Sequence, residues 1–210
     1  MAIRGFRLKL GFRIPDVSSA AIEPVGKDDQ ARVIATLVSA FIADPVERWL
    51  FPEALEYLTH FVAFVAAFAG DAFDRQTVWR LADFSAVAMW IPPGVEPNGD
   101  AIVAALSQSV SAEKQADAFS VLEQMDAAHP NDQHWYLPWL GVDCSRQGAG
   151  LGSDLLKQCL AYVDADHLPA FLETPNPRTV PFYERHGFGV TSVSQAGGCP
   201  PVTSMVRHRQ

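Results

Sequence analysis

The segment that decides the fold is Val142-Asp-Cys-Ser-Arg-Gln147-Gly-Ala-Gly-Leu-Gly152. An aromatic and aliphatic run at 134–142 precedes it and suits a buried strand, and an amphipathic helix follows it. Glycines let backbone N–H groups approach a ligand, and a helix N-terminus adds unsatisfied donors and partial positive charge. The segment predicts a phosphate-binding turn between a strand and a helix. The alternative is a glycine-rich turn that binds nothing.

The glycine spacing excludes two common phosphate loops. A P-loop ends in Gly-Lys-Ser/Thr, whereas Gly152 is followed by Ser153-Asp154. A Rossmann loop has Gly-x-Gly-x-x-Gly, and the glycines at 148, 150 and 152 have the wrong last spacing. The remaining pattern is Gln-x-x-Gly-x-Gly, formed by Gln147, Gly150 and Gly152.

A second motif follows at 172–188, where Asn176, Tyr183-Glu184 and Gly187-Phe188 occur in that order. Together the two motifs resemble the GNAT superfamily of N-acetyltransferases. The resemblance implies an α/β (α+β mixed sheet) GNAT acyl-CoA N-acyltransferase fold. It also implies acetyl-CoA as the cosubstrate.

Further stretches are similar to the puromycin N-acetyltransferase branch of that superfamily. They lie at 86–93, 134–137, 171–174 and 181–185, and the likeness covers roughly residues 75–190. Two departures stand near the expected site. Leu137-Pro138-Trp139 places a proline and a tryptophan before the loop, and Thr179 stands where relatives often carry Asn or Ala. These departures put the acceptor in question, and not the cofactor.

The resemblance assigns the cofactor-binding residues. The pyrophosphate would be held by backbone N–H groups of the loop: Gln147, Gly148, Ala149, Gly150, Leu151 and Gly152. The pantetheine arm would hydrogen-bond to Leu140, Gly141 and Val142, where relatives often have a strand bulge. The sequence leaves that bulge open. Asn176 would hydrogen-bond the cofactor, although Asn before Pro is equally typical of a turn or a helix cap.

Two residues are candidates for catalysis. Breakdown of a tetrahedral intermediate expels a thiolate, which the Tyr183 phenol could protonate; the alternative is a tyrosine that packs its ring on the sheet. Glu173, at a strand end, could deprotonate the amine or hold an ammonium group, or be only a solvated carboxylate. His134 and His186 are further basic candidates that better suit structural roles. No metal site is expected, since the three cysteines share no metal-like spacing.

The remaining elements follow from periodicity and breakers. Strands are expected at 21–25, 77–82, 85–91, 134–142, 169–173, 188–194 and 202–209. Helices are expected from Asp28 or Asp29 to Ala43, at 52–68, at 151–163 and at 181–186. The 52–68 helix has an apolar stripe of Leu55, Leu58, Val62, Val65 and Phe68, and the helix at 181–186 should not easily include Val180, which precedes a proline. Residues 95–130 read as a helical insertion between the third and fourth strands. Residues 1–19 read as an N-terminal extension, and 20–210 as a single GNAT domain.

Composition limits the partners. The chain of 210 residues has a formal net charge of −8 and no Lys/Arg cluster after residue 15, which argues against nucleic acid. The longest apolar stretch, 61–69, is too short to span a bilayer. An odd number of cysteines suits free thiols in the cytoplasm. Whether the chain forms a homodimer stays open.

The acceptor is expected to be a small-molecule primary amine. In GNAT proteins the region between the first two helices usually borders the acceptor pocket. Here that region carries acids and aromatics: Asp44, Glu47, Trp49, Phe51, Glu53, Glu56 and Tyr57. We therefore expect a partly apolar, cationic amine. A non-catalytic acyl-CoA sensor and a protein N-acetyltransferase are the alternative functions.

Overall fold

The computed structural model describes residues 21–69 and 71–209, so the expected extension at 1–19 lies outside the described residues. Its centre is a seven-stranded sheet in the order β1-β2-β3-β4-β5-β7-β6. The strands are β1 (Glu23–Pro24), β2 (Val78–Arg80), β3 (Ala86–Ile91), β4 (Trp135–Val142), β5 (Ala170–Thr174), β6 (Gly189–Ser194) and β7 (Val202–Arg207). β4 and β5 pair in parallel and the other neighbours are antiparallel. The predicted mixed sheet is confirmed.

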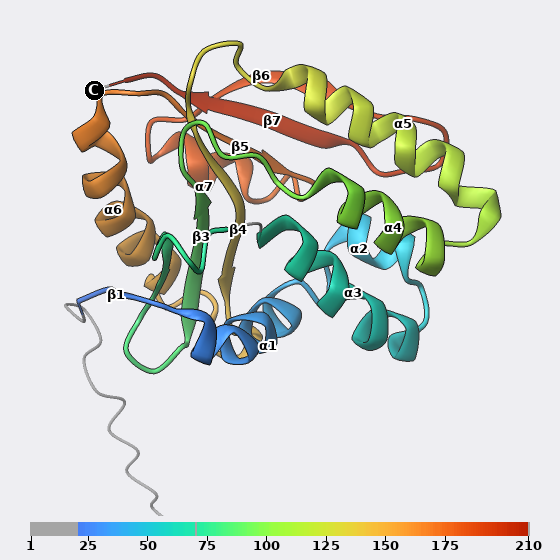
Figure 1. The fold of residues 1–210 in the computed structure, drawn as a ribbon, viewed down its shortest axis with the longest axis horizontal. Coiled ribbons are helices and arrows are strands. Elements are labelled where there is room, and N and C mark those ends of the chain that lie inside the picture. Colours follow the sequence, from blue (N-terminus) through green and yellow to red (C-terminus); the bar gives the residue numbers. More distant parts are fainter. Residues whose placement is uncertain (1–20, 70, 210) are drawn as a thin grey trace, which may run out of the picture.

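Helices cover both faces of this sheet (Figure 1). One face carries α1 (Gln30–Ala40), α3 (Ala54–Ala69), α4 (Gly99–Ser109) and α5 (Ala112–Ala128), with the short α2 (Pro45–Leu50) beside them. The other face carries α6 (Leu151–Val163), and α7 (Val180–Glu184) packs near its start. Three 3₁₀ turns complete the list: Lys27–Asp29, Cys144–Arg146 and Asp164–Asp166. The helices α4 and α5 lie between β3 and β4, as expected of the insertion.

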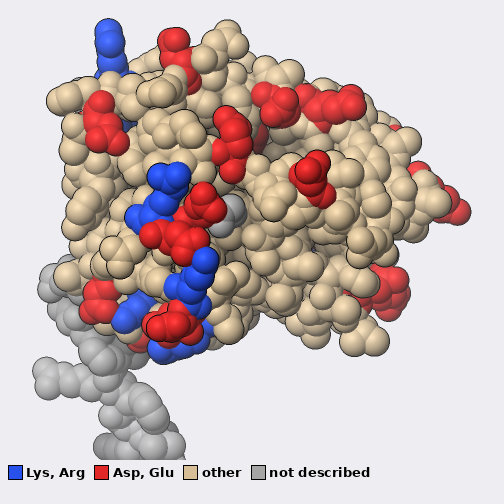
Figure 2. Space-filling view, viewed as in Figure 1, with Lys and Arg blue, Asp and Glu red and all other residues tan. Residues whose placement is uncertain are grey.

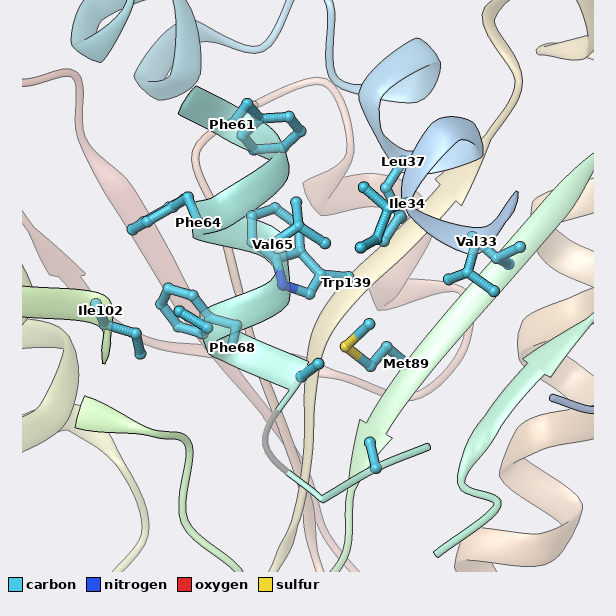
Figure 3. Packing of buried hydrophobic residues seen from close by; sticks show 14 of the residues in the cluster. Val33, Ile34, Leu37, Phe61, Phe64, Val65, Phe68, Met89, Ile102 and Trp139 are labelled. Carbon is cyan, nitrogen blue, oxygen red and sulfur yellow. The ribbon is translucent and has the colours of Figure 1, made fainter. Parts of the chain in front are cut away.

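Trp139 of β4 is the centre of the core on the α1 and α3 face (Figure 3). Its ring meets those of Phe41, Phe61 and Phe68 edge to face, at centroid distances of 5.1, 5.4 and 5.7 Å. Edge-to-face pairs each add about 0.5–1.5 kcal/mol beyond area burial. This aromatic cluster therefore fixes β4 against the two helices that border the site.

The core on the opposite face is built by α6. Six residues of α6 are buried: Leu151, Leu155, Leu156, Cys159, Leu160 and Val163. They pack with Trp90 and Trp135 from the sheet. Because α6 is anchored along its whole length, the glycine loop at its N-terminus has a rigid support.

Two helix predictions between residues 40 and 69 are wrong. The helix expected to run to Ala43 ends at Ala40, and Asp44-Pro45 begins α2, which was not predicted. Asp44 Oδ1 accepts from Val46 N at 3.0 Å and Glu47 N at 3.2 Å, and Pro45 occupies the first turn. The apolar stripe of α3 is also different. Leu55 and Leu58 are 77% and 53% exposed, and the buried side is formed by Tyr57, Phe61, Phe64, Val65 and Phe68.

A smaller correction concerns Val180, which is the first residue of α7. Pro181 then lies within the first turn, where a helix does not need the missing N–H. The preceding turn also leads into the helix, since Thr179 N donates to Asn176 O at 3.0 Å. This turn outweighs the usual bias of a residue before proline against the helical backbone conformation.

The insertion is fastened to the far end of the sheet, where α5 lies alongside β6 and β7 (Figure 1). The side-chain amide of Gln124 bonds to both backbone groups of Gln195, at 3.1 and 3.0 Å. Asp117 Oδ2 accepts from Gly198 N at 2.9 Å. These bonds join α5 to the β6–β7 loop and close one side of the cavity described below.

Basic side chains on the face drawn in Figure 2 lie beside acidic ones, near the edge formed by β1 and β2. Two ion pairs in this part of the chain are Lys27–Asp74 at 2.7 Å and Arg80–Glu23 at 2.6 Å. Exposed pairs of this kind contribute about 0–1 kcal/mol each. They pair two of the basic side chains near this edge with acids.

Candidate active site

The strands β4 and β5 part in the middle of the sheet. Their parallel pairing joins Trp135 to Ala170 and ends at Leu137 and Leu172. Beyond that pair, β4 continues to Val142 paired only with β3. The backbone edge of β4 that faces β5 is therefore free of ladder bonds in this region.

A β-bulge lies where the strands part. Met89 pairs with Trp139 and Ile91 with Tyr136, so Leu137 and Pro138 together lie opposite Trp90. The pairing is regular at Leu140–Val142, where the sequence left a bulge open, and the bulge lies two to three residues earlier. Proline suits it, because proline has no N–H to donate to a ladder.

The glycine loop joins this edge to α6. Gly148 and Gly150 have φ of +78° and +85°, and Gly150 is the N-cap of α6. A Cβ built at either glycine would meet no protein atom within 4 Å. The left-handed backbone therefore requires glycine here, and the space beside it could receive a ligand. Successive N–H groups in such a turn form an anion-binding concavity at a helix N-terminus.

The side chain of Gln147 braces the loop. Its Nε2 donates to Val142 O at 3.1 Å and to Ala40 O at 3.4 Å, so it joins the end of β4 to the end of α1. At the other end of the loop, a Cβ on Gly152 would lie 3.3 Å from Val142 and 3.8 Å from Phe182. The two positions shape the loop through packing and hydrogen bonds within the protein.

A single cavity of about 790 Å³ runs from the loop to the helical insertion. Its lining contains both expected catalytic residues, Tyr183 and Glu173. It also contains nine of the ten expected cofactor residues: Leu140, Gly141, Val142, Gln147, Gly148, Gly150, Leu151, Gly152 and Asn176. Ala149 lies outside the lining. Residues far apart in the sequence thus meet in one space.

Tyr183 lies on α7 with its ring held between Phe182 and Phe188, at centroid distances of 4.9 and 6.0 Å. Burial raises the pKa of its phenol well above 10, and the negative charge of Asp44 adds to the shift. The phenol therefore keeps its proton at all physiological pH values. Both the packing alternative and the acid role are compatible with this position.

Glu173 is the next-to-last residue of β5, and its side chain is only 4% exposed. Its Oε1 lies 3.5 Å from His129 Nε2, and Tyr136 hydrogen-bonds to the same carboxylate. Burial and this carboxylate raise the pKa of Tyr136 well above 10. Glu173 is thus no solvated strand-end carboxylate. His129 was not identified from the sequence, where it is only the end of a helix before Pro130.

Two further carboxylates, Asp44 and Glu47, enter the cavity from α2. Burial raises the pKa of Asp44 to about 6, against the opposing effect of its two backbone hydrogen bonds. Burial and the Asp44 charge raise the pKa of Glu47 well above 4.5. Glu47 Oε2 is buried, with no hydrogen-bond partner among residues 21–69 and 71–209. Such an acid is satisfied by a cationic ligand.

The neighbouring cations are engaged elsewhere. Arg48 lies over the ring of Tyr57 at 5.4 Å and donates to Pro52 O. Lys114 donates to Trp49 O at 2.5 Å. Of the other acids and aromatics expected to border the pocket, Trp49 lines the cavity, whereas Glu53 and Glu56 are exposed and Phe51 and Tyr57 belong to the core.

Three arginines also line the cavity: Arg146, Arg178 and Arg185. They come from the glycine-loop region and from either side of α7, whereas the carboxylates come from α2 and β5. None of the three was identified from the sequence. A cavity with basic residues around the loop and acids elsewhere can take an anionic and a cationic ligand together.

Asn176 and Thr179 form the turn before α7. Asn176 Oδ1 accepts from Arg178 N at 3.1 Å, as in the turn role that the sequence left open. The Thr179 hydroxyl contacts Thr174 Oγ1 at 2.5 Å and donates to Asn176 O at 2.8 Å. The contact of Asn176 with a cofactor stays a prediction.

His186 joins α6 to α7: its Nε2 contacts Ser153 Oγ at 2.9 Å and its Nδ1 contacts Phe182 O at 2.8 Å. Its structural role fits these bonds. Within the described ranges, no three His, Cys, Asp or Glu residues are grouped to hold a metal ion. No helix in the same ranges has the length and apolarity to cross a bilayer.

The family model for the acetyltransferase (GNAT) family matches residues 69–188, more than half of the chain. The chain belongs to the GNAT family of acetyltransferases. The match contains the insertion, the glycine loop, Glu173 and Tyr183. The GNAT fold and an acetyltransferase activity follow from it.

Relatives of this GNAT protein share the fold at low identity. An uncharacterized N-acetyltransferase of Schizosaccharomyces pombe is 24% identical over 188 residues, which cover 80% of this chain and 74% of that protein. The crystal structure titled histone acetyltransferase HPA2 and related acetyltransferase, from Corynebacterium glutamicum, has a TM-score of 0.63 at 21% identity, covering 90% and 96% of the two chains. Polyamine N-acetyltransferase of Drosophila melanogaster, which forms N-acetylagmatine, has a TM-score of 0.61 at 13% identity, covering 90% and 99%.

Proposed function

We propose that this GNAT protein transfers an acetyl group from acetyl-CoA to the primary amine of a small, cationic molecule. The observation that carries the proposal is the single cavity joining the glycine loop, the parted strands, Tyr183 and Glu173. The fold alone would not specify chemistry. The acid–base groups within this cavity support a direct transfer.

The residues present fit acetyl-CoA. The open space beside Gly148 and Gly150 would receive the pyrophosphate, with the helix N-terminus and the arginines supplying positive charge. The free edge of β4 at Leu140–Val142 would hydrogen-bond the pantetheine arm. When bound, acetyl-CoA supplies an activated acetyl thioester. The role of the chain is to orient that group and manage the protons.

Tyr183 is the proposed general acid. Its phenol is buried, protonated and in the cavity lining, so it can donate its proton to the leaving thiolate. The aromatic neighbours on both sides hold the ring in place. No cysteine relay is needed, because Cys144 is exposed in the turn before the loop.

Glu173 is the proposed base, which takes a proton from the bound ammonium so that the amine nitrogen can attack. Asp44 and Glu47 are the proposed recognition site for positive charge. Their carboxylates are buried without an ion-pair partner among residues 21–69 and 71–209, a costly arrangement that a cation would relieve. Trp49, Leu106 and Val121 line the same cavity and favour an acceptor with an apolar body.

A panel of acceptors tests this proposal, with release of free thiol as the measurement. The panel contains arylalkylamines, aliphatic mono- and diamines, puromycin and peptides with free N-termini. Turnover of small cationic amines supports the proposal, and turnover of puromycin would support the likeness to that branch. Exclusive turnover of peptides would replace it with protein acetylation. Glu173→Gln should lower kcat for the best amine by about 10²-fold, and unchanged kinetics would remove Glu173 from the mechanism.

A further inference from the structure

His129 lies between Glu173 and a second histidine. His129 Nε2 is 3.5 Å from Glu173 Oε1, and His129 Nδ1 is 3.0 Å from His134 Nε2. His134 Nδ1 is 2.8 Å from the backbone oxygen of Asp132. The three side chains form a row that starts at Glu173, in the cavity, and continues away from the cavity through His129 to His134.

The ring of His129 is held firmly in this row. It packs on Phe171 and Tyr136 at centroid distances of 4.2 and 4.7 Å. The residue is also the C-cap of α5, so the insertion ends at the middle of the row. One quarter of the His129 side chain remains exposed, which gives the ring access to water.

The hydrogen bonds determine which nitrogens carry protons. A backbone oxygen only accepts, so His134 Nδ1 must donate to Asp132 O. Burial lowers the pKa of His134, which favours a neutral ring with Nε2 as an acceptor. His129 Nδ1 must then donate to that atom, which leaves His129 Nε2 without a proton, 3.5 Å from Glu173 Oε1, a buried oxygen with no hydrogen-bond partner among the described residues. Unless a proton lies between them, His129 Nε2 and the Glu173 carboxylate are two acceptors that face each other.

We propose that His129, with its tautomer fixed by His134, is a positioning residue that takes the proton which Glu173 removes from the acceptor amine. This inference rests on the proposed function. The amine N–H bond breaks as a Glu173 O–H bond forms. That O–H bond then breaks as an N–H bond forms at His129 Nε2, and the imidazolium releases its proton to water. Glu173 is returned to its charged form for the next turnover.

Several other groups act on this row. Tyr136 bonds to Glu173 from β4, and Glu96 from the β3–α4 connection acts on His134 together with His129 and Glu173. Tyr136 donates to the carboxylate and stays protonated, so it does not compete for the transferred proton. Glu96 favours a charged His134, and burial opposes it as the larger effect.

Kinetics of the full chain with the best amine test the proposal. His129→Asn should lower kcat by about 10²-fold and alter the acidic limb of the kcat–pH profile, with the KM for acetyl-CoA unchanged. His134→Leu should give much of the same loss, whereas His134→Gln keeps an acceptor for His129 Nδ1 and should restore the rate. His60→Gln, on α3 and outside the cavity lining, is the matched control. Equal rates in wild type and His129→Asn would overturn the proposal.

A readout without turnover separates this inference from the proposed function. Nitrogen-15 NMR of the free protein near pH 8 should show His129 as the Nδ1–H tautomer, and His134→Leu should shift it toward Nε2–H. An Nε2–H tautomer in the wild type would overturn the relay even if the enzyme is active. If Tyr183→Phe and Glu173→Gln slow turnover while His129→Asn does not, only the relay fails. If no amine is acetylated, the proposed function fails.

Discussion

Leu137 and Leu172 are the last paired residues between β4 and β5, and the cavity opens directly beyond them. Up to this pair, the two strands satisfy one another's backbone groups. After it, β4 runs on to the glycine loop while β5 ends at Glu173 and Thr174. One branching point therefore directs a backbone edge, an anion-binding turn and a buried acid toward a common space.

Gly150→Glu should abolish stabilisation of the protein by acetyl-CoA, which raises Tm by mass action when it binds the folded state. The new side chain would enter the space beside the loop and add negative charge there. Gly150→Ala is the matched control, because it shares the backbone strain at φ +85° and lacks the charge. We expect both variants to lose about 1–2 kcal/mol of stability. Only Gly150→Glu should lose the rise in Tm that acetyl-CoA causes. An equal rise in Tm with acetyl-CoA in both variants would contradict the assignment of the glycine loop as the pyrophosphate site.

Tyr183→Phe should keep acetyl-CoA binding and lower kcat by about 10²-fold, because it removes the proton donor and retains the ring. The measurement is steady-state thiol release together with the Tm shift by acetyl-CoA. Tyr162→Phe, at a residue of α6 that is 59% exposed, is the control and should be neutral. An unaffected kcat would reduce Tyr183 to a packing residue.

Asp44→Asn should change the pH dependence of stability. The folded pKa of Asp44 is about 6, above the usual 3.8, so its contribution is fully present below pH 3.8 and is lost as pH rises through 6. From pH 4 to 7, the wild-type unfolding free energy should fall by about 2–3 kcal/mol relative to the variant. Asparagine retains the N-cap. Urea denaturation across this range measures the difference, with the exposed Glu53→Gln as control. If the unfolding free energies of wild type and Asp44→Asn change with pH in parallel, the raised pKa of Asp44 is refuted.

Gly141→Ala should destabilise the protein by about 1–3 kcal/mol through overpacking. A Cβ there would lie 2.8 Å from Leu37 Cδ2 and 2.9 Å from Ala40 Cβ, so α1 would have to move away from β4. Gly189→Ala in β6 is the matched strand control, since its Cβ would meet its nearest atom at 3.9 Å. Equal denaturation midpoints for the two variants would show that α1 adjusts freely.

The sequence predicted the elements whose signals are local. The glycine loop, α6 and β5 follow from glycine spacing and apolar periodicity. Tyr183 and Glu173 line the same cavity as that loop, and their catalytic roles stay predictions. The face of α3 could not be predicted by periodicity, because apolar residues occur on nearly all of its sides. Only packing against Trp139 selects the buried one.

Other features depend on contacts between distant segments. The helix α2 was missed because Asp44-Pro45 is both a stop and a start signal, and the cap bonds decide between them. The row from His129 to Glu173 joins the end of the insertion to β5, which no local pattern indicates. The bulge likewise requires the register of β3 against β4.

The extra residue at Leu137–Pro138 acts as a phase shift in β4. Before it, even-numbered Tyr136 faces the α1 and α3 layer; after it, odd-numbered Trp139 and Gly141 do. Side chains alternate with a period of two, and the bulge takes one residue out of that alternation. Removing Pro138 would therefore give a regular strand in which Trp139 still faces the α1 and α3 layer. Removing Leu140 instead would turn over the residues that follow it and drive Val142 toward α1. The segment between the bulge and the glycine loop is thus a reading frame, in which substitution is tolerated far better than deletion.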